Sequence, residues 1–454
     1  MTERLFGTDG IRGLAGQGNM APDRILAVGA AVGRHFRQDG DTSRRVVIGK
    51  DTRLSSYMVE AALTAGLTSA GLNVHLLGPV PTPAVGYLTR SMRADLGIMV
   101  SASHNPYHDN GIKLFGADGY KLGDDDERAI EALVASGAVA TPGIAPERIG
   151  RARRVDDGLY RYMDRVKSVL PRDTSLKGLR VVLDCANGAA WRAAPEVLWE
   201  LGAEVFPLGT EPNGTNINTE CGSTDTAKAA AMVRRYRADL GVCLDGDADR
   251  VILIDETGRP CDGDQIIALM AGTRARQGRL DTPTIATTIM SNIGLERYLA
   301  GIGLSMTRTP VGDRHIVEEM RRSGLQLGGE PSGHIVMADH ATTGDGLAAA
   351  LVVIDAMQRS GEPASSALSV FDPVPQRLEN IRLPRPGGDP LKASDVEAAI
   401  ARARDILGED GRLIVRNSGT EPLVRIMAEC DDAARRDSAI DCVAQALTRE
   451  NGTS

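Results

Sequence analysis

Aromatic side chains are scarce in this sequence, at 3% of its 454 residues, although hydrophobic residues as a whole make up 42%. Proteins that hold single-stranded nucleic acid depend on aromatic side chains for base stacking. The formal net charge of −8 is also unfavourable for a polyanionic partner. We therefore exclude nucleic acid as the main partner.

The sequence also lacks long apolar runs. None approaches the roughly 18 residues of a membrane helix, and the first ten residues lack the apolar core of a signal peptide. The six cysteines are scattered and include no C-x-x-C pair, a pattern typical of buried thiols in a reducing compartment. These absences predict a cytoplasmic protein without a membrane partner.

A serine-rich turn at 101–106 (SASHNP) follows an apolar run of strand length, Leu96–Val100. Ligands bind at the carboxyl ends of strands in open α/β sheets, so Ser103 is placed like a reactive side chain, although a plain turn fits equally well. No nucleophile elbow G-x-S-x-G accompanies it. His104 is expected to be a poor base for Ser103, because successive side chains of an extended chain point to opposite faces.

Strand-like and helix-like segments alternate along most of the chain, which predicts βαβ units and largely parallel sheets. The length suggests three or four domains at roughly 150 residues each. Small and Pro-rich residues near 138–146 indicate a first boundary. The segment Pro373–Pro390, rich in Pro and Gly, is interpreted as a linker edge.

Three aspartates, Asp245, Asp247 and Asp249, follow a second apolar run, Leu240–Leu244. Carboxylates at this spacing converge in a loop, and their repulsion favours a hard metal ion. A solvated acidic turn is the weaker alternative. An EF-hand is excluded because Arg250 stands at its obligatory glycine. An aspartyl-phosphate phosphatase with Asp245 as nucleophile stays open.

Two later polar loops carry binding chemistry. The first contains Glu330, Ser332 and His334, a set that suits hydrogen bonds to sugar hydroxyls, although a plain loop fits as well. The second is the loop 416–422 (RNSGTEP), closed by Arg425. Two guanidinium groups that flank hydroxyls and a glycine are typical of a phosphate cradle. A hairpin turn with paired surface charges is the alternative.

Five motifs in this order resemble the α-D-phosphohexomutase superfamily across essentially the whole chain, and most of all its bacterial phosphoglucosamine mutase branch. They are FGTDGIRG at 6–13, SASHNP with NGIK at 101–113, DGDADR at 245–250, GEPSGH at 329–334 and RNSGTEP at 416–422. Some positions depart from the pattern of the branch: Pro331 stands where Gln or Met is commoner, Pro310 where Lys is usual, and His315 where Tyr is usual. These differences bear on fine substrate preference and not on phosphoryl transfer.

The resemblance implies an α/β fold with three related domains of mixed, largely parallel sheets and a smaller C-terminal α+β domain around a central cleft. The expected domains are 1–152 with the phosphoserine loop, 153–257 with the metal loop, 258–372 with the sugar loop and 373–454 with the phosphate loop.

The resemblance also implies roles for individual residues. Ser103 is expected to be a phosphoserine and, with Asp245, Asp247 and Asp249, to hold Mg²⁺. The remaining catalytic residues implied are Lys113, His334, Arg12 and Arg250. The implied substrate-binding residues are Arg314, Glu330, Ser332, Arg416, Ser418, Gly419, Thr420 and Arg425.

The reaction implied is the interconversion of glucosamine 6-phosphate and glucosamine 1-phosphate through a 1,6-bisphosphate, which feeds amino-sugar nucleotide and cell-wall precursor synthesis. We expect a phosphosugar substrate and an initial phosphate donor for Ser103, and we leave a homodimer open. Three alternatives stay open: a glucomutase or mannomutase of the same superfamily, the phosphatase that uses Asp245, and a non-catalytic phosphosugar-binding regulator.

Overall fold

A computed structural model describes residues 5–7, 9–37, 44–137, 144–382, 389–417 and 423–452. The chain forms two compact units. The first comprises Met1–Thr288 with Leu304–Val370, and the second comprises Ile289–Gly303 with Phe371–Ser454. No helix in the described ranges is long and apolar enough to cross a membrane.

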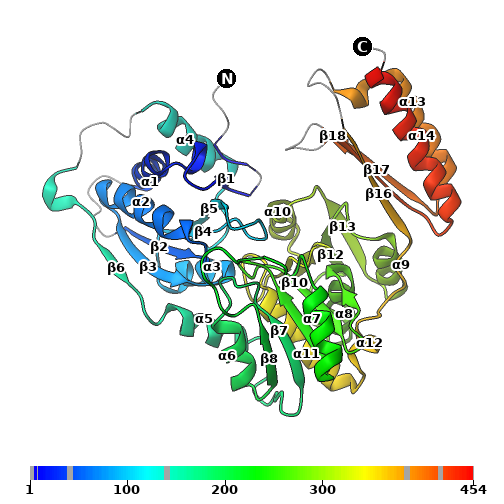
Figure 1. Ribbon diagram of the computed structural model, residues 1–454, viewed down its shortest axis with the longest axis horizontal. Helices are drawn as coiled ribbons and strands as arrows, with labels where there is room; N and C mark the ends of the chain where they lie inside the picture. The colour runs from blue at the N-terminus through cyan, green and yellow to red at the C-terminus, as the bar shows by residue number, and fades with distance from the viewer. Residues whose placement is uncertain are drawn as a thin grey trace. The chain divides into compact units, whose positions relative to one another are not determined.

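The first sheet of the larger unit is mixed and has the strand order β1-β5-β4-β2-β3-β6 (Figure 1). The strands β2, β3, β4 and β6 are parallel, whereas β5 runs antiparallel between β4 and β1. The strands are β1 (Ile11–Leu14), β2 (Arg45–Lys50), β3 (Asn73–Pro79), β4 (Leu96–Val100), β5 (Asp109–Gly116) and β6 (Ala152–Arg154). Their helices are α1 (Pro22–Phe36), α2 (Ser55–Ser69), α3 (Thr82–Ser91) and α4 (Asp124–Ala135).

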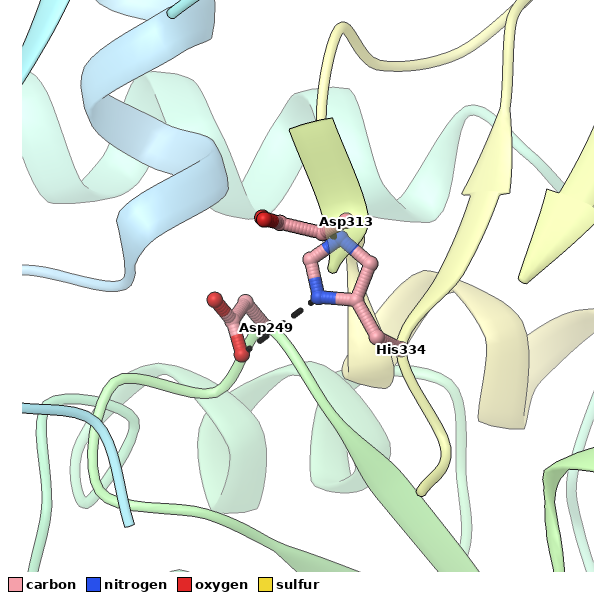
Figure 2. Close-up of side chains that lie close together, drawn as sticks. All are labelled: Asp249, Asp313 and His334. Atoms are coloured by element: carbon pink, nitrogen blue, oxygen red, sulfur yellow. Dashed lines mark ion pairs between the residues drawn. The ribbon is translucent and has the colours of Figure 1, made fainter. Parts of the chain in front are cut away.

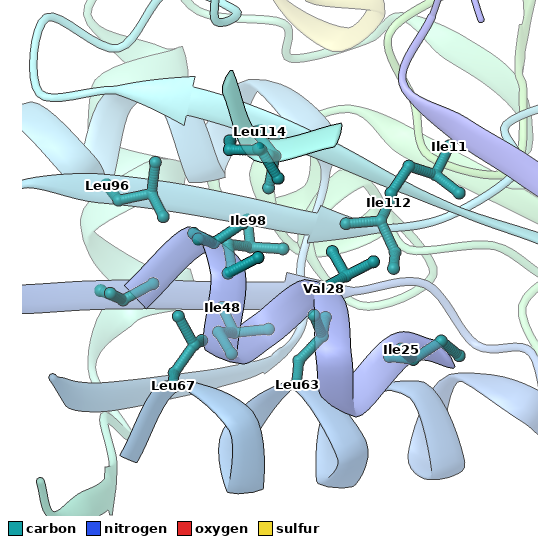
Figure 3. Close-up of a cluster of buried hydrophobic side chains, with 14 of the residues drawn as sticks. Ile11, Ile25, Val28, Ile48, Leu63, Leu67, Leu96, Ile98, Ile112 and Leu114 are labelled. Atoms are coloured by element: carbon teal, nitrogen blue, oxygen red, sulfur yellow. The ribbon is translucent and has the colours of Figure 1, made fainter. Parts of the chain in front are cut away.

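The core of this part lies between the sheet and the helices α1, α2 and α4, where aliphatic side chains such as Val28, Leu63 and Ile98 are fully buried (Figure 3). Helix α3 packs against β2 and β4 as well. Because helices cover the central strands, β4 is buried at every position, which explains why its sequence is a continuous apolar run and not an alternating one.

The second sheet has the order β11-β10-β9-β7-β8, with β7, β8 and β9 parallel and β10 and β11 antiparallel. Its strands are β7 (Arg180–Asp184), β8 (Glu204–Leu208), β9 (Leu240–Leu244), β10 (Val251–Asp255) and β11 (Pro260–Cys261). The helices of this region are α5 (Gly158–Lys167), α6 (Ala193–Glu200) and α7 (Ala227–Tyr236). The short connection between β9 and β10 carries the acidic loop.

The third sheet has the order β13-β12-β14-β15, in which only β15 is antiparallel to its neighbour. Its strands are β12 (Thr284–Thr288), β13 (Ser305–Thr309), β14 (Leu327–Gly329) and β15 (Ile335–Met337). The helices are α8 (Gly263–Arg276), α10 (Asp313–Ser323), α11 (Gly346–Ser360) and α12 (Ala364–Ala367). Asp345 caps α11 by accepting a hydrogen bond from the Ala348 amide at 3.0 Å.

The second unit contains α9 (Ile293–Gly301) and an antiparallel sheet of order β16-β18-β17. The strands are β16 (Gln376–Arg382), β17 (Arg412–Asn417) and β18 (Leu423–Glu429), and the covering helices are α13 (Ser394–Leu407) and α14 (Ala433–Gly452). A separate hydrophobic core joins these two helices to the sheet.

The predicted fold class is confirmed: three α/β regions with mixed sheets precede a smaller α+β region. The interpretation of Pro373–Pro390 as a linker edge is wrong for its centre, because β16 lies there and pairs with β18 along its whole length. The side chains of β16 alternate between exposed and half-buried positions, so the strand lacks the apolar run that marks β4. The four domain boundaries stay predictions.

Candidate active site

Ser103 lies just beyond β4 in a strained backbone conformation. Its φ of +52° places it in the left-handed region of the backbone. Residues other than glycine rarely adopt this region, and those that do are enriched at functional sites. The Ser103 amide donates to Ser101 Oγ at 2.9 Å. Its own Oγ is buried and donates to Asp245 Oδ2 at 2.5 Å. The predicted nucleophile therefore touches the predicted metal loop.

Two residues that the sequence analysis missed hold this turn. Arg53 is fully buried, and its Nη2 donates to the carbonyl oxygens of Ser103 at 2.9 Å and Asn105 at 2.8 Å. The Asn218 side-chain amide donates to the same two carbonyls, at 2.9 and 3.0 Å. The sequence feature that points to Arg53 is the pair Asp51-x-Arg53 directly after β2. In the structure these two side chains form a buried ion pair of 2.7 Å.

The three aspartates form a buried cluster whose carboxylate oxygens lie within 4.8 Å of one another. Among the described residues, Asp247 Oδ1 and Asp249 Oδ1 are buried without a hydrogen-bond donor. Burial, together with the charges of Asp249 and Asp247, raises the pKa of Asp245 well above its usual value. Orphaned carboxylate oxygens in a buried acidic cluster fit a hard divalent cation.

Lys113, on β5, lies at the centre of this charge. Its Nζ donates to Asp247 Oδ2 at 2.9 Å and to Asp249 Oδ2 at 3.2 Å. Burial lowers the pKa of Lys113, but the charges of Asp247, Asp9 and Asp249 outweigh burial and hold the pKa well above the usual value. Lys113 is therefore a buried cation at the acidic loop.

His334 reaches the cluster from the third region. Figure 2 shows its ring between Asp249 and Asp313, with Nδ1 3.6 Å from Asp249 Oδ1 and Nε2 3.7 Å from Asp313 Oδ2. The Gly344 amide donates to Nε2 at 3.0 Å. A nitrogen that accepts this bond carries no proton, which places the hydrogen of the neutral ring on Nδ1, towards Asp249. Burial lowers the pKa of His334, but the charges of Asp249, Asp313 and Glu330 outweigh burial and raise the pKa, so protonation of the ring competes with the Gly344 bond.

A further, half-buried chain of charges supports His334 and was not found from the sequence. Lys121 donates to both Asp9 and Asp313, and thereby joins the N-terminal loop to the start of α10. Burial lowers the pKa of Lys121, but Asp313 and Asp9 raise it by more. The chain Asp9–Lys121–Asp313 thus continues the network from Lys113 to His334.

Two arginines border Ser103. Arg12 donates to Asp9 and, at 3.5 Å, to Asn105 Oδ1. Arg250 donates from Nη1 to His104 Nδ1 at 3.1 Å. Burial and the charges of Arg250 and Arg12 lower the pKa of His104 to about 4, so this imidazole is neutral near neutral pH.

The expectation that His104 points away from Ser103 is wrong. Its Nδ1 lies 3.4 Å from Ser103 Oγ. The physical reason is the left-handed backbone at Ser103, which brings the two side chains together where an extended chain separates them.

The predicted sugar-binding residues occupy two places. Glu330 accepts hydrogen bonds from the Gly312 amide and from Ser332 Oγ, both at 3.1 Å. Arg314 instead contacts α4, where it pairs with Glu127 and with Asp124 at 2.7 Å.

Arg416 and Arg425 belong to the second unit, where they lie directly opposite each other on β17 and β18. Burial and the charge of Arg425 lower the pKa of Arg416. Ser418, Gly419 and Thr420 lie outside the described residues.

Comparison with known proteins identifies the family to which this chain belongs. Models of phosphoglucomutase/phosphomannomutase α/β/α domains I, II and III match residues 3–140, 160–258 and 262–374, and the model of the C-terminal domain matches residues 378–445. The chain is 59% identical to a phosphoglucosamine mutase of Roseobacter denitrificans over 98% of both chains. This chain belongs to the α-D-phosphohexomutase superfamily. It is also 57% identical to a phosphoglucosamine mutase of Paracoccus denitrificans, over 99% of this chain and 100% of the relative.

Solved structures of this superfamily share the fold. A phosphoglucomutase/phosphomannomutase family protein from Burkholderia thailandensis superposes with a TM-score of 0.82, at 24% identity, covering 98% of this chain and 97% of that protein. A putative phosphomannomutase from Thermus thermophilus gives a TM-score of 0.78 at 25% identity, covering 99% of this chain and 100% of that protein.

Proposed function

We propose that this phosphohexomutase interconverts glucosamine 6-phosphate and glucosamine 1-phosphate through a phosphoserine at position 103. The observation that carries the proposal is the 2.5 Å contact of Ser103 Oγ with Asp245 inside a buried cluster of three carboxylates. Curated relatives at 57–59% identity that bear the name phosphoglucosamine mutase support the choice of sugar and the class of isomerase.

Magnesium is the cofactor that we propose for the acidic loop. Asp245, Asp247 and Asp249 would hold it together with a phosphoryl oxygen on Ser103. Their oxygen-only donor set suits a hard cation, and the orphaned oxygens of Asp247 and Asp249 leave ligand positions for it. Bound there, Mg²⁺ would offset the charge of the phosphoserine, about −1.5 to −2, and stabilise the phosphoryl group in transfer.

The first half-reaction transfers the phosphoryl group from Ser103 to the 1-OH of glucosamine 6-phosphate. The bond from phosphorus to Ser103 Oγ breaks, the bond to O1 forms, the sugar hydroxyl loses its proton and Ser103 Oγ gains one. The second half-reaction returns the 6-phosphoryl group of the bisphosphate to Ser103 and releases glucosamine 1-phosphate. Arg12 and Arg250, which border Ser103, would neutralise phosphate charge during both transfers.

Lys113 and His334 are the residues that we propose for proton transfer. Lys113 is held as a cation by Asp247 and Asp249, so it carries a proton near neutral pH, and its raised pKa means that these carboxylates must let go before that proton is released easily. The carboxylates around His334 raise its pKa, but its Nε2 must release the Gly344 amide before it can accept a proton. The geometry therefore favours Lys113 as the acid and leaves His334 to act from Nδ1 or after a shift of Gly344.

Substrate recognition is divided between two groups of residues. Glu330 and Ser332, with Arg314 nearby in the chain, are proposed to bind the sugar. Arg416 and Arg425 are proposed to bind the phosphate that is not in transfer, with Ser418, Gly419 and Thr420. Two guanidinium groups placed opposite each other in a β ladder repel, and a bound phosphate relieves that repulsion.

The decisive experiment is peptide mass analysis of the purified protein, with turnover measured for the wild type and for Ser103→Ala. We expect part of the protein to carry a phosphoryl group on Ser103, and Ser103→Ala to lose nearly all turnover. A phosphoryl label on Asp245 would instead identify the phosphatase. Binding of phosphosugars without exchange between the 1- and 6-phosphates would identify a regulator.

A second measurement tests the sugar. We expect kcat/KM of the phosphorylated protein to be highest for glucosamine 6-phosphate among the glucosamine, glucose and mannose 6-phosphates. A higher value for glucose or mannose would assign the chain to the glucomutase or mannomutase activity of the same superfamily.

A further inference from the structure

A cavity of about 530 Å³ lies within the larger unit, lined by the end of α5 and the segment after it, by α8, by α11 and by the residues that follow β15. None of the residues assigned above to catalysis, metal binding or substrate binding lines it. Part of its wall is apolar and includes Leu170, Met270, Met337 and Val352. The cavity therefore offers an apolar surface to the body of a small molecule.

One side of the same cavity carries excess positive charge. Asp339 accepts from the nearly buried Arg274 at 2.9 Å and lies 3.5 Å from Arg279. Arg165 donates only to backbone carbonyls, those of Asp339 at 3.1 Å and His340 at 2.5 Å, and its buried Nε has no partner among the described residues. Arg274 and Arg279 thus share one carboxylate, and Arg165 pairs with none among the described residues. The lining also holds Arg359, which pairs with Asp355 at 2.8 Å, and Asp173, so four arginines face three aspartates. The positive charge that is left over at Arg165, Arg274 and Arg279 favours a phosphate or carboxylate ligand.

The charged side of the cavity is linked to the active site by short contacts. His340 Nε2 lies 3.3 Å from Asp345 Oδ2, and Tyr162 donates to Asp345 Oδ1 at 3.0 Å. The residue before Asp345 is Gly344, whose amide donates to His334 Nε2 at 3.0 Å. A second hollow of about 410 Å³ is also lined by Arg165 and His340. The residues that connect the cavity to His334 therefore border a second empty space.

We propose that the cavity is a regulatory site for a small organic anion, with its phosphate or carboxylate at Arg165, Arg274 and Arg279 and its apolar body against the aliphatic wall. A ligand anion competes with the Asp339 carboxylate for Arg274 and Arg279, and with the Asp339 and His340 carbonyls for Arg165. The segment that follows β15 then shifts, and His340, Asp345 and Gly344 transmit the shift to His334. Occupancy of the cavity alters the rate of turnover without occupying the substrate site.

Phenyl phosphate, which combines an aromatic body with one phosphate, is a suitable probe. Binding is measured by calorimetry on the full chain carrying Ser103→Ala, with saturating glucosamine 6-phosphate to block the substrate site. Arg279→Gln removes one exposed guanidinium from the cavity, and Arg276→Gln, on the same helix end but outside the lining, is its matched control. We expect one probe per chain, bound at least tenfold more weakly by Arg279→Gln and equally by Arg276→Gln.

The rate is then measured on the phosphorylated chain at saturating substrate. We expect phenyl phosphate to change kcat at least twofold in the wild type and in Arg276→Gln, and not in Arg279→Gln. His340→Gln is expected to bind the probe and to lose the change in kcat. Absence of binding, equal binding by both arginine variants, or an effect on KM alone would overturn the proposal. The binding measurement needs no turnover, so its failure is distinct from failure of the proposed mutase activity.

Discussion

Arg53 donates a hydrogen bond to the carbonyl oxygen of Ser103 at 2.9 Å, from a side chain that is wholly buried. The same guanidinium donates to the carbonyls of Asn105, Pro106 and Asp109 and pairs with Asp51. The left-handed backbone of Ser103 is intrinsically unfavourable, by roughly 1–3 kcal/mol. Arg53 therefore stabilises a turn that would otherwise relax.

Replacement of Arg53 by Met should lower the free energy of unfolding by about 3–5 kcal/mol, because it leaves Asp51 buried without its cation and removes a donor from four carbonyls. Two of these carbonyls keep the Asn218 amide as a donor. Chemical denaturation measures the change. Arg128→Met, at an exposed ion pair on α4, should change the free energy by less than about 0.5 kcal/mol. Equal stabilities of the two variants would show that Arg53 is not needed to hold the turn.

Gly333→Ala should lower kcat by about 10²-fold. Gly333 has a φ of +89°, and an added Cβ would lie 2.0 Å from the Val251 carbonyl oxygen, so the loop that carries His334 must move away from the acidic loop. Gly324→Ala is the control, since its φ of +66° is similar but no atom lies within 4 Å of an added Cβ. That variant should keep its turnover and lose about 1–2 kcal/mol of stability. Similar turnover in both variants would contradict the prediction.

Removal of divalent metal with a chelator should stop turnover, and added Mg²⁺ should restore it. Asp247→Asn should need a higher Mg²⁺ concentration and turn over at least 10²-fold more slowly, because it removes one charge from the proposed ligand set. Asp156→Asn, at a position that is 90% exposed, should respond to Mg²⁺ as the wild type does. Full activity in chelator would exclude a metal at the acidic loop.

The pH dependence of stability should contain a contribution from His75 on β3. Burial lowers its pKa, and Arg153, its partner in the register with β6, and Arg45 lower it further. The unfolded chain binds a proton at His75 below about pH 6.5, whereas the folded chain resists it. The contribution of His75 to the free energy of unfolding is therefore fully present above about pH 6.5. It is lost as the pH drops from there towards the lower pKa of His75 in the folded state.

Denaturation midpoints between pH 7.5 and 5 measure this effect. His75→Gln should flatten the decline on the acid side, and His108→Gln, at an exposed position, should leave it unchanged. A decline that is equally steep in His75→Gln would assign the acid sensitivity to other groups.

The strands that the sequence predicted best are those buried on both faces. Leu96–Val100 and Leu240–Leu244 were predicted with the bounds that the structure gives, because polar residues end the apolar run on each side. Strand β16 was missed because its residues alternate around polar side chains at a sheet edge. Its pairing with β18 is a tertiary contact, and such contacts override local composition.

The site was predictable where chemistry is concentrated in one loop. The acidic loop and the serine turn were predictable from residue type and spacing. In the structure the two loops meet where Ser103 donates a hydrogen bond to Asp245. Asn218 and Lys121 carry no such local signal, since each acts on residues far away in the chain, and the pair Asp51-x-Arg53 does not by itself show that Arg53 reaches the serine turn. The left-handed backbone at Ser103 could not be predicted either, because the rule that was applied holds for extended chains. This backbone conformation is the reason that the expectation for His104 is wrong.

The pairing of Lys113 with Asp247 and Asp249 has a consequence for the synthesis of the chain. Lys113 leaves the ribosome long before the acidic loop does, and its ammonium ends up almost fully buried. Until the loop arrives, this buried cation lacks the two partners that compensate it most directly, and the hydroxyl of Ser103 lacks Asp245. A nascent chain therefore cannot form these contacts of Lys113 and Ser103 before its second region has folded against its first.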